Sequence, residues 1–272
     1  MQPIMQSQDR QQQMPSLKQL EALRNEVVKF NQIGMELYEL QEFLPASFHF
    51  NEALNILLKI ADESQKQKNP STLPHARSKE PSMAPNINHS LRRSLLQPLS
   101  VDPSVALTES QDWSLVYALT VLHNSALTHY AMGCLDKAEK LLLLAVKLLH
   151  DDEEESELEG RDTLRIDPDL CVLIMSIYHT LGTVLSYMET ESLVQEAMEC
   201  FVEAANIGME QLGEHVLVAC VFVSMGRVLV REGYVREASG AYSMASSIYG
   251  TLQAYSDTGT VFEVGCHGAA AA

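Results

Sequence analysis

Along much of this chain, apolar side chains recur every three or four residues, which is the pattern of a helix that buries one face. The pattern is clearest near the C-terminus, at Phe222, Met225, Gly226 and Leu229. Gly233 follows as a turn candidate, and the helical periodicity then resumes. We therefore expect an all-α chain whose helices pair as hairpins.

Four blocks of the chain share an arrangement of small residues. In the predicted first helices these residues are Gly34, Ala126, Gly182 and Gly226, and in the second helices they are Ala53, Ala138, Ala197 and Ala238. Residues this small let paired helices approach closely. Since one hairpin cannot bury its apolar face alone, we expect the four hairpins to stack around a continuous core.

Polar segments separate these blocks. Residues 1–16 are predicted to be a disordered N-terminus, and 256–272 a tail of low complexity. The first hairpin is expected at 17–62, and three more at 111–255. The stretch 63–110 is rich in Ser and Pro, so we predict a flexible linker that buries too little apolar surface to become ordered.

Helix ends and loops within the blocks are also predicted. Pro45 should break a helix, which makes 42–50 a loop. The turn of the third hairpin, near 189–192, should be longer than the others. Residues 151–163 begin with seven carboxylates in nine positions and are interpreted as an exposed acidic loop. Pro168 suits the first turn of a helix, so a helix should begin there.

The repeated spacing resembles the tetratricopeptide repeat. The last block carries it best, with Phe222 in the place of the usual Trp, followed by Gly226, Gly233, Ala238, Tyr242 and Ala245. The resemblance covers roughly 27–62, 115–150, 171–208 and 219–250. The closing proline is missing and the repeats are unevenly spaced. The opening at 31–34 is also similar to short, divergent members from diatoms.

This resemblance implies a solenoid of about four irregular repeats that serves protein–protein interaction or scaffolding. In the family, the first helix of each hairpin lines a concave groove that binds a peptide or helix. By position, the groove residues here are Asn31, Tyr38, His123, Asn124, Leu127, Tyr130, His179, Thr183, Tyr187, Arg227 and Arg231. The alternative is that several of them only solvate the inner wall.

One specialised role of the family is disfavoured. Members that bind the C-terminal carboxylate of chaperone tails carry Asn directly after the small residue of the first helix. The residues in that place here are Met35, Leu127, Thr183 and Arg227. Arg227 and Arg231 instead suggest a positive end of the groove, facing acidic groups of a peptide.

The net charge of the chain indicates which classes of partner it can bind. Its 36 acidic and 19 basic residues give a net charge of −17. An acidic body repels phosphates, so we expect neither nucleic acid nor an anionic membrane surface as partner. The longest apolar run, 216–226, is too short to cross a membrane. Another protein remains as the expected partner.

Residue motifs for catalysis or cofactor binding are missing from the sequence. It has no phosphate-binding Gly-rich loop and no serine-hydrolase or zinc-protease motif. His123, His129 and Cys134 fall on different faces of a helix, which argues against a metal site. We therefore predict no enzyme activity, cofactor or metal; the alternative is a non-catalytic subunit or a catalytic protein on an all-α frame.

Three further expectations concern location, self-association and modification. The five cysteines form no C-x-x-C pair, so we predict reduced thiols and a cytoplasmic protein, with the nucleus as alternative. Apolar residues at 216–223, Ile248 and Leu252 should be exposed and are interpreted as a self-association surface. Arg92-Arg93-Ser94 resembles a basophilic kinase site, although a plain linker patch is the stronger interpretation.

Overall fold

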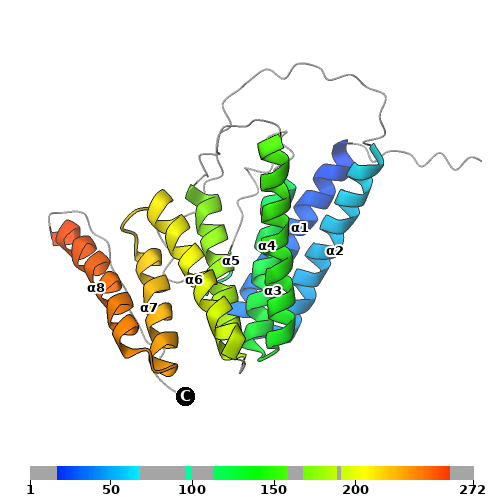
Figure 1. Cartoon of the computed structure of the whole chain (residues 1–272). Helices are drawn as coiled ribbons and strands as arrows, with labels where there is room; N and C mark the ends of the chain where they lie inside the picture. Colours follow the sequence, from blue (N-terminus) through cyan, green and yellow to red (C-terminus); the bar gives the residue numbers. More distant parts are fainter. Residues whose placement is uncertain (1–16, 68–95, 100–112, 159–167, 189–190, 258–272) are drawn as a thin grey trace, which may run out of the picture.

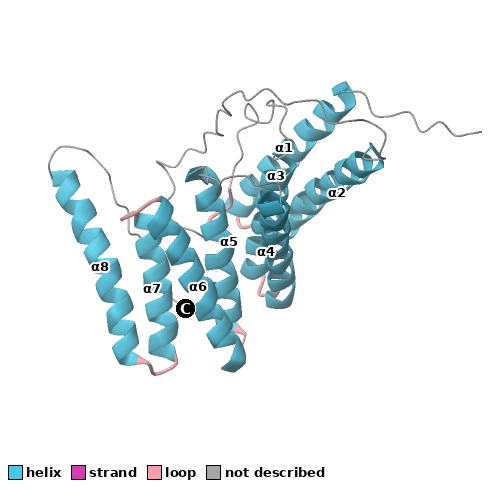
Figure 2. Ribbon diagram, turned by 45° about the horizontal axis from the view of Figure 1, so that its top comes forward, coloured by secondary structure: helices cyan, strands magenta, loops and turns pink. Residues whose placement is uncertain are grey.

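The computed structural model describes residues 17–67, 96–99, 113–158, 168–188 and 191–257. In these ranges the chain forms helices and no strands (Figure 2), which confirms the all-α prediction. The helices are α1 (Leu17–Glu39), α2 (Phe43–Gln67), α3 (Trp113–Ala131), α4 (Leu135–Leu158), α5 (Pro168–Tyr187), α6 (Glu191–Gln211), α7 (Val216–Arg231) and α8 (Val235–Asp257).

The helices pack in the order of the sequence. Helices α1 and α2, α3 and α4, α5 and α6, and α7 and α8 form four hairpins, and each hairpin packs on the next. The result is a row of hairpins with α1 and α2 at one end and α8 at the other (Figure 1). The first helices of neighbouring hairpins, α1 with α3, α3 with α5 and α5 with α7, also touch.

Two apolar clusters hold the row together. The larger runs through α3 to α8 and includes Leu142 and Phe201, both fully buried. The smaller joins α1 and α2 to α3 and includes Phe50 and Val121. Since α3 contributes to both clusters, the first hairpin and the rest of the row share one continuous interior.

Small residues lie where paired helices cross, as predicted. A Cβ atom added to Gly182 would lie 2.9 Å from the carbonyl oxygen of Ala197. One added to Gly226 would lie 2.6 Å from the ring of Tyr242, and one added to Gly34 would lie 2.6 Å from the ring of Phe50. No side chain fits at these three crossings unless its neighbours move.

The prediction of a loop at 42–50 is wrong. Helix α2 begins at Phe43, so Pro45 lies in its first turn. Backbone N–H groups of a first turn have no acceptor within their own helix, so the missing N–H of proline costs nothing there. Only residues 40–42 separate α1 from α2, and Gln41 adopts the positive φ of 63° that closes this turn.

The shorter turn changes which alanine lies at the first crossing. Ala46 follows Gly34 by twelve residues, the spacing that also separates Ala126 from Ala138. Its side chain is fully buried. Ala46, rather than the predicted Ala53, is therefore the counterpart of Ala138, and Ala53 is buried farther along α2.

Two other loop predictions are also wrong. Helix α4 continues to Leu158, so residues 151–158 of the predicted acidic loop are helical. Each like-charge pair along a helix costs only a few tenths of a kcal/mol, and Glu has a high helix propensity. In the third hairpin only residues 188–190 separate α5 from α6, so the extra residues belong to the start of α6. Helix α5 begins at Pro168 as predicted.

Two parts of the predicted linker lie within the described residues, because 63–67 form the end of α2 and 96–99 lie outside the helices. Residues 96–99 are described, and Leu99 is only 3% exposed. The predictions for 1–16, 68–95, 100–112 and 258–272, including the Arg92-Arg93-Ser94 motif, lie outside the described residues.

Within the described part of the chain, α5 is the one helix long and apolar enough to cross a membrane, over Leu170–Tyr187. Core helices meet the same criteria of length and composition. Because 78% of this window is buried inside the structure, the packing of α5 against α4 and α6 accounts for its apolar composition.

Candidate binding surface

Asn124 on α3 holds the main chain of a residue outside the helices. Its Oδ1 accepts a hydrogen bond from the Leu99 backbone N–H at 2.8 Å, and its Nδ2 donates to the Leu99 carbonyl at 2.9 Å. Asn124 itself is fully buried. One amide side chain thus pairs with both polar main-chain groups of one residue, as a neighbouring strand would.

Asn31 on α1 completes this arrangement from the adjacent hairpin. Its Nδ2 donates to the Leu99 carbonyl at 3.2 Å, and its Oδ1 accepts from Asn124 Nδ2 at 2.9 Å. The two asparagines therefore orient each other and share one ligand carbonyl. Since buried polar groups are costly to leave unpaired, this network favours a main chain that supplies one donor and one acceptor at this point. We call Asn31 and Asn124 the asparagine pair.

The side chain of Leu99 adds an apolar anchor. It joins the larger apolar cluster, in which Leu119 and Leu122 of α3 also take part. Full burial of a leucine side chain contributes about 1.5–3 kcal/mol. The asparagine pair therefore contacts the main chain, and the cluster beside it accommodates one aliphatic side chain.

Similar polar contacts join the other first helices. His123 Nε2 on α3 lies 3.2 Å from Thr180 Oγ1 on α5, and His179 Nε2 on α5 lies 2.8 Å from Ser224 Oγ on α7. Asn31, His123 and His179 all stand three residues before the small residue of their own helix. Each of them contacts a polar residue on the first helix of the following hairpin. We call these three contacts the junction bonds.

The partly buried Tyr130, the exposed Tyr187 and Arg231 lie side by side, and we call them the aromatic row. The ring centroids of Tyr130 and Tyr187 lie 6.0 Å apart, and the Arg231 guanidinium lies 5.9 Å from the Tyr187 ring centroid. Burial first, and then the neighbouring Tyr187, raise the pKa of Tyr130 to about 12. The phenol is therefore a neutral hydrogen-bonding group at physiological pH, next to a Tyr187 side chain that is 57% exposed.

The residues predicted to line a groove divide into two groups. Asn31, His123, Asn124, Leu127, His179 and Thr183 are buried between helices, whereas Tyr38, Tyr130, Tyr187, Arg227 and Arg231 are partly or fully exposed. The structure brings Asn31 and Asn124 together on Leu99, and Tyr130, Tyr187 and Arg231 together in the aromatic row. Several of the predicted residues therefore form the joints between hairpins.

Sequence reasoning missed Leu99 as well as Thr180 and Ser224. The available signal for Leu99 was the short run Leu95-Leu96-Gln97-Pro98-Leu99, whose leucines are unusual in a polar stretch. Thr180 and Ser224 each stand two residues before the small residue of their helix, as does Asn124. A comparison of polar residues at that position would have suggested the junction bonds.

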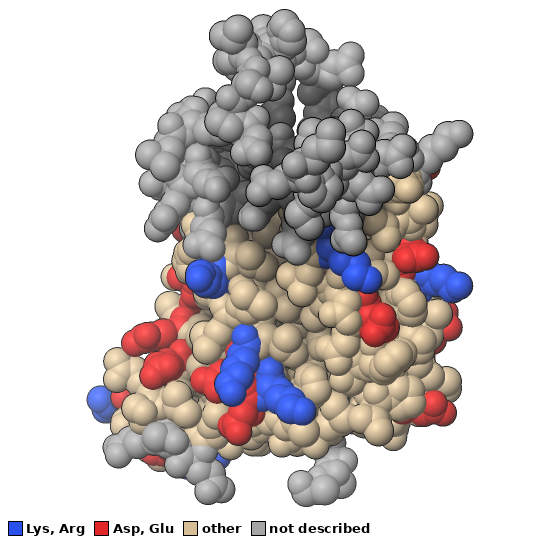
Figure 3. Space-filling view, turned by 90° about the vertical axis from the view of Figure 1, so that its right-hand side faces the viewer, with Lys and Arg blue, Asp and Glu red and all other residues tan. Residues whose placement is uncertain are grey.

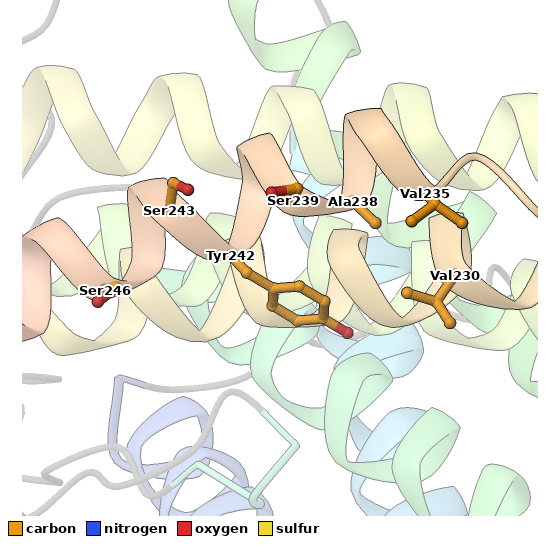
Figure 4. Close-up of a pocket in the computed structure, with 7 residues that line it drawn as sticks. All are labelled: Val230, Val235, Ala238, Ser239, Tyr242, Ser243 and Ser246. Atoms are coloured by element: carbon orange, nitrogen blue, oxygen red, sulfur yellow. The ribbon is translucent and has the colours of Figure 1, made fainter.

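The residues predicted to form a self-association surface are buried or partly buried. Residues 217–219, Val221 and Ile248 are buried, because α7 and α8 turn these side chains toward the core. The exposed apolar residues of this hairpin are instead Val230, Tyr234, Val235, Tyr242 and Met244. A shallow hollow on α7 and α8 is lined by Val230, Val235 and Tyr242 and by three serines (Figure 4). Self-association stays a prediction, which light scattering would test.

On the α1–α2 end of the row, basic and acidic side chains lie side by side without a patch of one sign (Figure 3). Among the described residues, no three His, Cys, Asp or Glu side chains come close enough to hold a metal ion. The asparagine pair and the aromatic row are therefore the candidate surface.

Comparison of the chain with protein-family models, with curated proteins and with solved structures gives no match.

Proposed function

We propose that this chain is a protein-interaction module of four tetratricopeptide-like hairpins, and that its first helices bind an extended segment of another protein. The observation that carries the proposal is the pairing of Asn124 with both main-chain polar groups of Leu99. These groups belong to a segment outside the helices, 25 positions away in the sequence. A surface that pairs with the main chain of one non-helical segment in this way has the chemistry to bind others.

The spacing of the first hairpin supports the tetratricopeptide interpretation. Gly34, Gln41 and Ala46 are separated by seven and five residues, as are Ala126, Gly133 and Ala138 in the second hairpin. Gln41, Gly133 and Gly233 all have positive φ at the turn. This shared spacing and turn geometry support the interpretation of the first hairpin as a repeat of the same kind as the second.

The exposed end of the aromatic row supports a preference in the ligand. Arg231 lies over Tyr187 and pairs with Glu232 at 3.0 Å, and Arg227 is exposed nearby on the same helix. One guanidinium group over an aromatic ring and a second on the same helix favour an acidic residue in a peptide that extends toward α7. A cytoplasmic location stays a prediction.

Selection from a random peptide library tests the proposal. The library is panned on the full chain and on Leu99→Asp, which weakens the hold on the chain's own segment. Enriched peptides are then measured on Asn31→Ala/Asn124→Ala and on Thr128→Ala. Thr128 is a matched control because it is buried on the same helix and its hydroxyl bonds only the Asn124 carbonyl.

We expect enriched peptides to lose at least about tenfold in affinity on the asparagine double variant, since about 1.4 kcal/mol of lost hydrogen bonding corresponds to that factor. Thr128→Ala should bind them normally. Peptides that bind the double variant equally well, or no enrichment on either chain, would contradict a peptide-binding role for this surface.

A further inference from the structure

The segment 96–99 occupies the asparagine pair. We propose that this segment is an internal ligand, and that a partner displaces it with an extended segment that places an aliphatic residue where Leu99 lies. The inference rests on the proposed function, because it assumes that the asparagine pair binds protein segments. It adds that the asparagine pair holds residues 96–99 when no partner is bound. It also adds the chemistry of the partner segment that displaces these residues.

A residue from another protein could make the contacts that Leu99 makes. The hydrogen bonds go to its backbone N–H and carbonyl, which nearly every residue possesses. The buried side chain requires only an aliphatic group of similar size. A segment from another protein can therefore make the same set of contacts.

Helix contacts that do not involve this segment also join the first two hairpins. Helix α3 packs directly on α2 and touches α1, and Tyr117 and Val121 of α3 join the smaller apolar cluster. The hydrogen bond between Asn124 and Asn31 also joins the two hairpins directly. Departure of Leu99 would expose one anchor site and leave the helix contacts in place.

The site selects the chemistry of the partner. The described groups that hydrogen-bond the Leu99 main chain are the neutral amides of Asn31 and Asn124, and the Asn31 amide nitrogen also lies 3.6 Å from the Met35 sulfur. A charged residue at the anchor position would lose its hydration without gaining a partner. Pro98 has no N–H and favours an extended backbone. The fitting ligand is an extended, uncharged segment of the type Pro-Leu, with Leu replaceable by Ile, Val or Met.

The segment competes strongly because it is part of the same chain. A tethered ligand has an effective concentration on the order of 1 mM. An external peptide with the same contacts must exceed this value to occupy half of the sites. Weakening the internal copy should therefore tighten the binding of an added peptide by about tenfold or more.

The experiment uses a fluorescent synthetic peptide that copies residues 94–102, added to the full-length chain. Its binding is measured by anisotropy on the wild type, on Leu99→Asp and on Leu58→Asp. Leu58 is a matched control, because it is an exposed leucine on α2 outside the segment. We expect at least about tenfold tighter binding to Leu99→Asp than to the other two, and loss of binding when Asn124→Ala is added to Leu99→Asp.

Hydrogen exchange on the wild type provides a second test that does not depend on a variant that folds. The Leu99 amide is hydrogen-bonded to Asn124 and should exchange slowly. Excess peptide should speed its exchange while the amides in the middle of α3 and α5 remain protected. If exchange at Leu99 does not change at peptide concentrations that saturate the anisotropy signal, the segment is not displaced and the proposal fails.

The outcomes separate this inference from the proposed function. Equal binding to wild type and Leu99→Asp, abolished by Asn124→Ala, would overturn the internal ligand and leave the interaction module standing. Unfolding of Leu99→Asp, seen by circular dichroism, would make the segment part of the core and also overturn the inference. Success of the library selection with failure of the 94–102 peptide would show that the pair binds partners but does not hold its own segment as a competitor.

Discussion

Replacement of Gly182 by alanine tests whether close helix approach organises the hairpins. The added Cβ would lie 2.9 Å from the Ala197 carbonyl oxygen and 3.0 Å from two atoms of the Phe201 ring. Ordinary contacts begin at 3.4 Å, so α5 and α6 must separate by about 0.5 Å, the difference between 3.4 and 2.9 Å. A backbone carbonyl cannot rotate away as a side chain can, and the Phe201 ring is itself buried.

Two opposing effects set the size of the change. Overpacking of this kind costs about 1–3 kcal/mol. Alanine is a better helix former than glycine by about 1 kcal/mol. We expect Gly182→Ala to lower the free energy of unfolding by up to about 2 kcal/mol, which corresponds to a fall of up to roughly 6 °C in Tm for a chain of this size.

Thermal and urea unfolding, followed by circular dichroism, provide the measurement. Gly240→Ala is the matched control, because Gly240 lies in α8 with no atom within 4 Å of the added Cβ. It should raise stability by about 0.5–1 kcal/mol through helix propensity alone. If Gly182→Ala stabilised the chain as much as Gly240→Ala, close packing of α5 on α6 would not be a requirement of the fold.

Three other changes are expected. Gln41→Gly should raise the free energy of unfolding by about 0.5–1 kcal/mol in urea titrations, because a positive φ of 63° strains a residue that has a Cβ. Burial first, and then Lys137, lower the pKa of His129 from 6.5, so the folded state disfavours its protonation. Stability should fall as the pH drops below 6.5, and this loss should be smaller in His129→Gln than in wild type. Burial raises the pKa of the Cys171 and Cys200 thiols from 9.0 to about 11, so iodoacetamide at pH 8 should modify them about 100-fold more slowly in the native chain than in urea, as peptide mass spectrometry would show.

The helices were predictable because their signal is local. Period-3.6 patterning and small residues at fixed offsets identified the pairs at Gly182 and Gly226, since each contact joins neighbouring segments. The turn before α2 was not predictable from residue preferences. Gln41 adopts a backbone conformation that favours glycine, and Pro45 lies in the first turn of a helix, which tolerates proline.

The candidate surface was harder to predict from the sequence than the helices were. Asn31 and Asn124 were identified by position, but Leu99, which they contact, lies in a stretch whose composition predicts disorder. The contact between Leu99 and Asn31 spans 68 residues, a distance over which no periodicity in the sequence carries information. Short segments that are ordered by a few contacts with a preformed surface escape any analysis based on composition.

The junction bonds bear on how such a row can change in length. Each interface pairs a donor or acceptor from one hairpin with a small polar group on the next, and the pairs differ: asparagine with asparagine, histidine with threonine, histidine with serine. A chain without its third hairpin would place His123 opposite Ser224, which repeats the histidine–serine pairing already used by His179. Loss of the second hairpin would also remove Asn124 and with it the hold on Leu99. Loss of the third hairpin would instead remove Tyr187 from between Tyr130 and Arg231, while Asn31 and Asn124 on the first two hairpins would still contact Leu99.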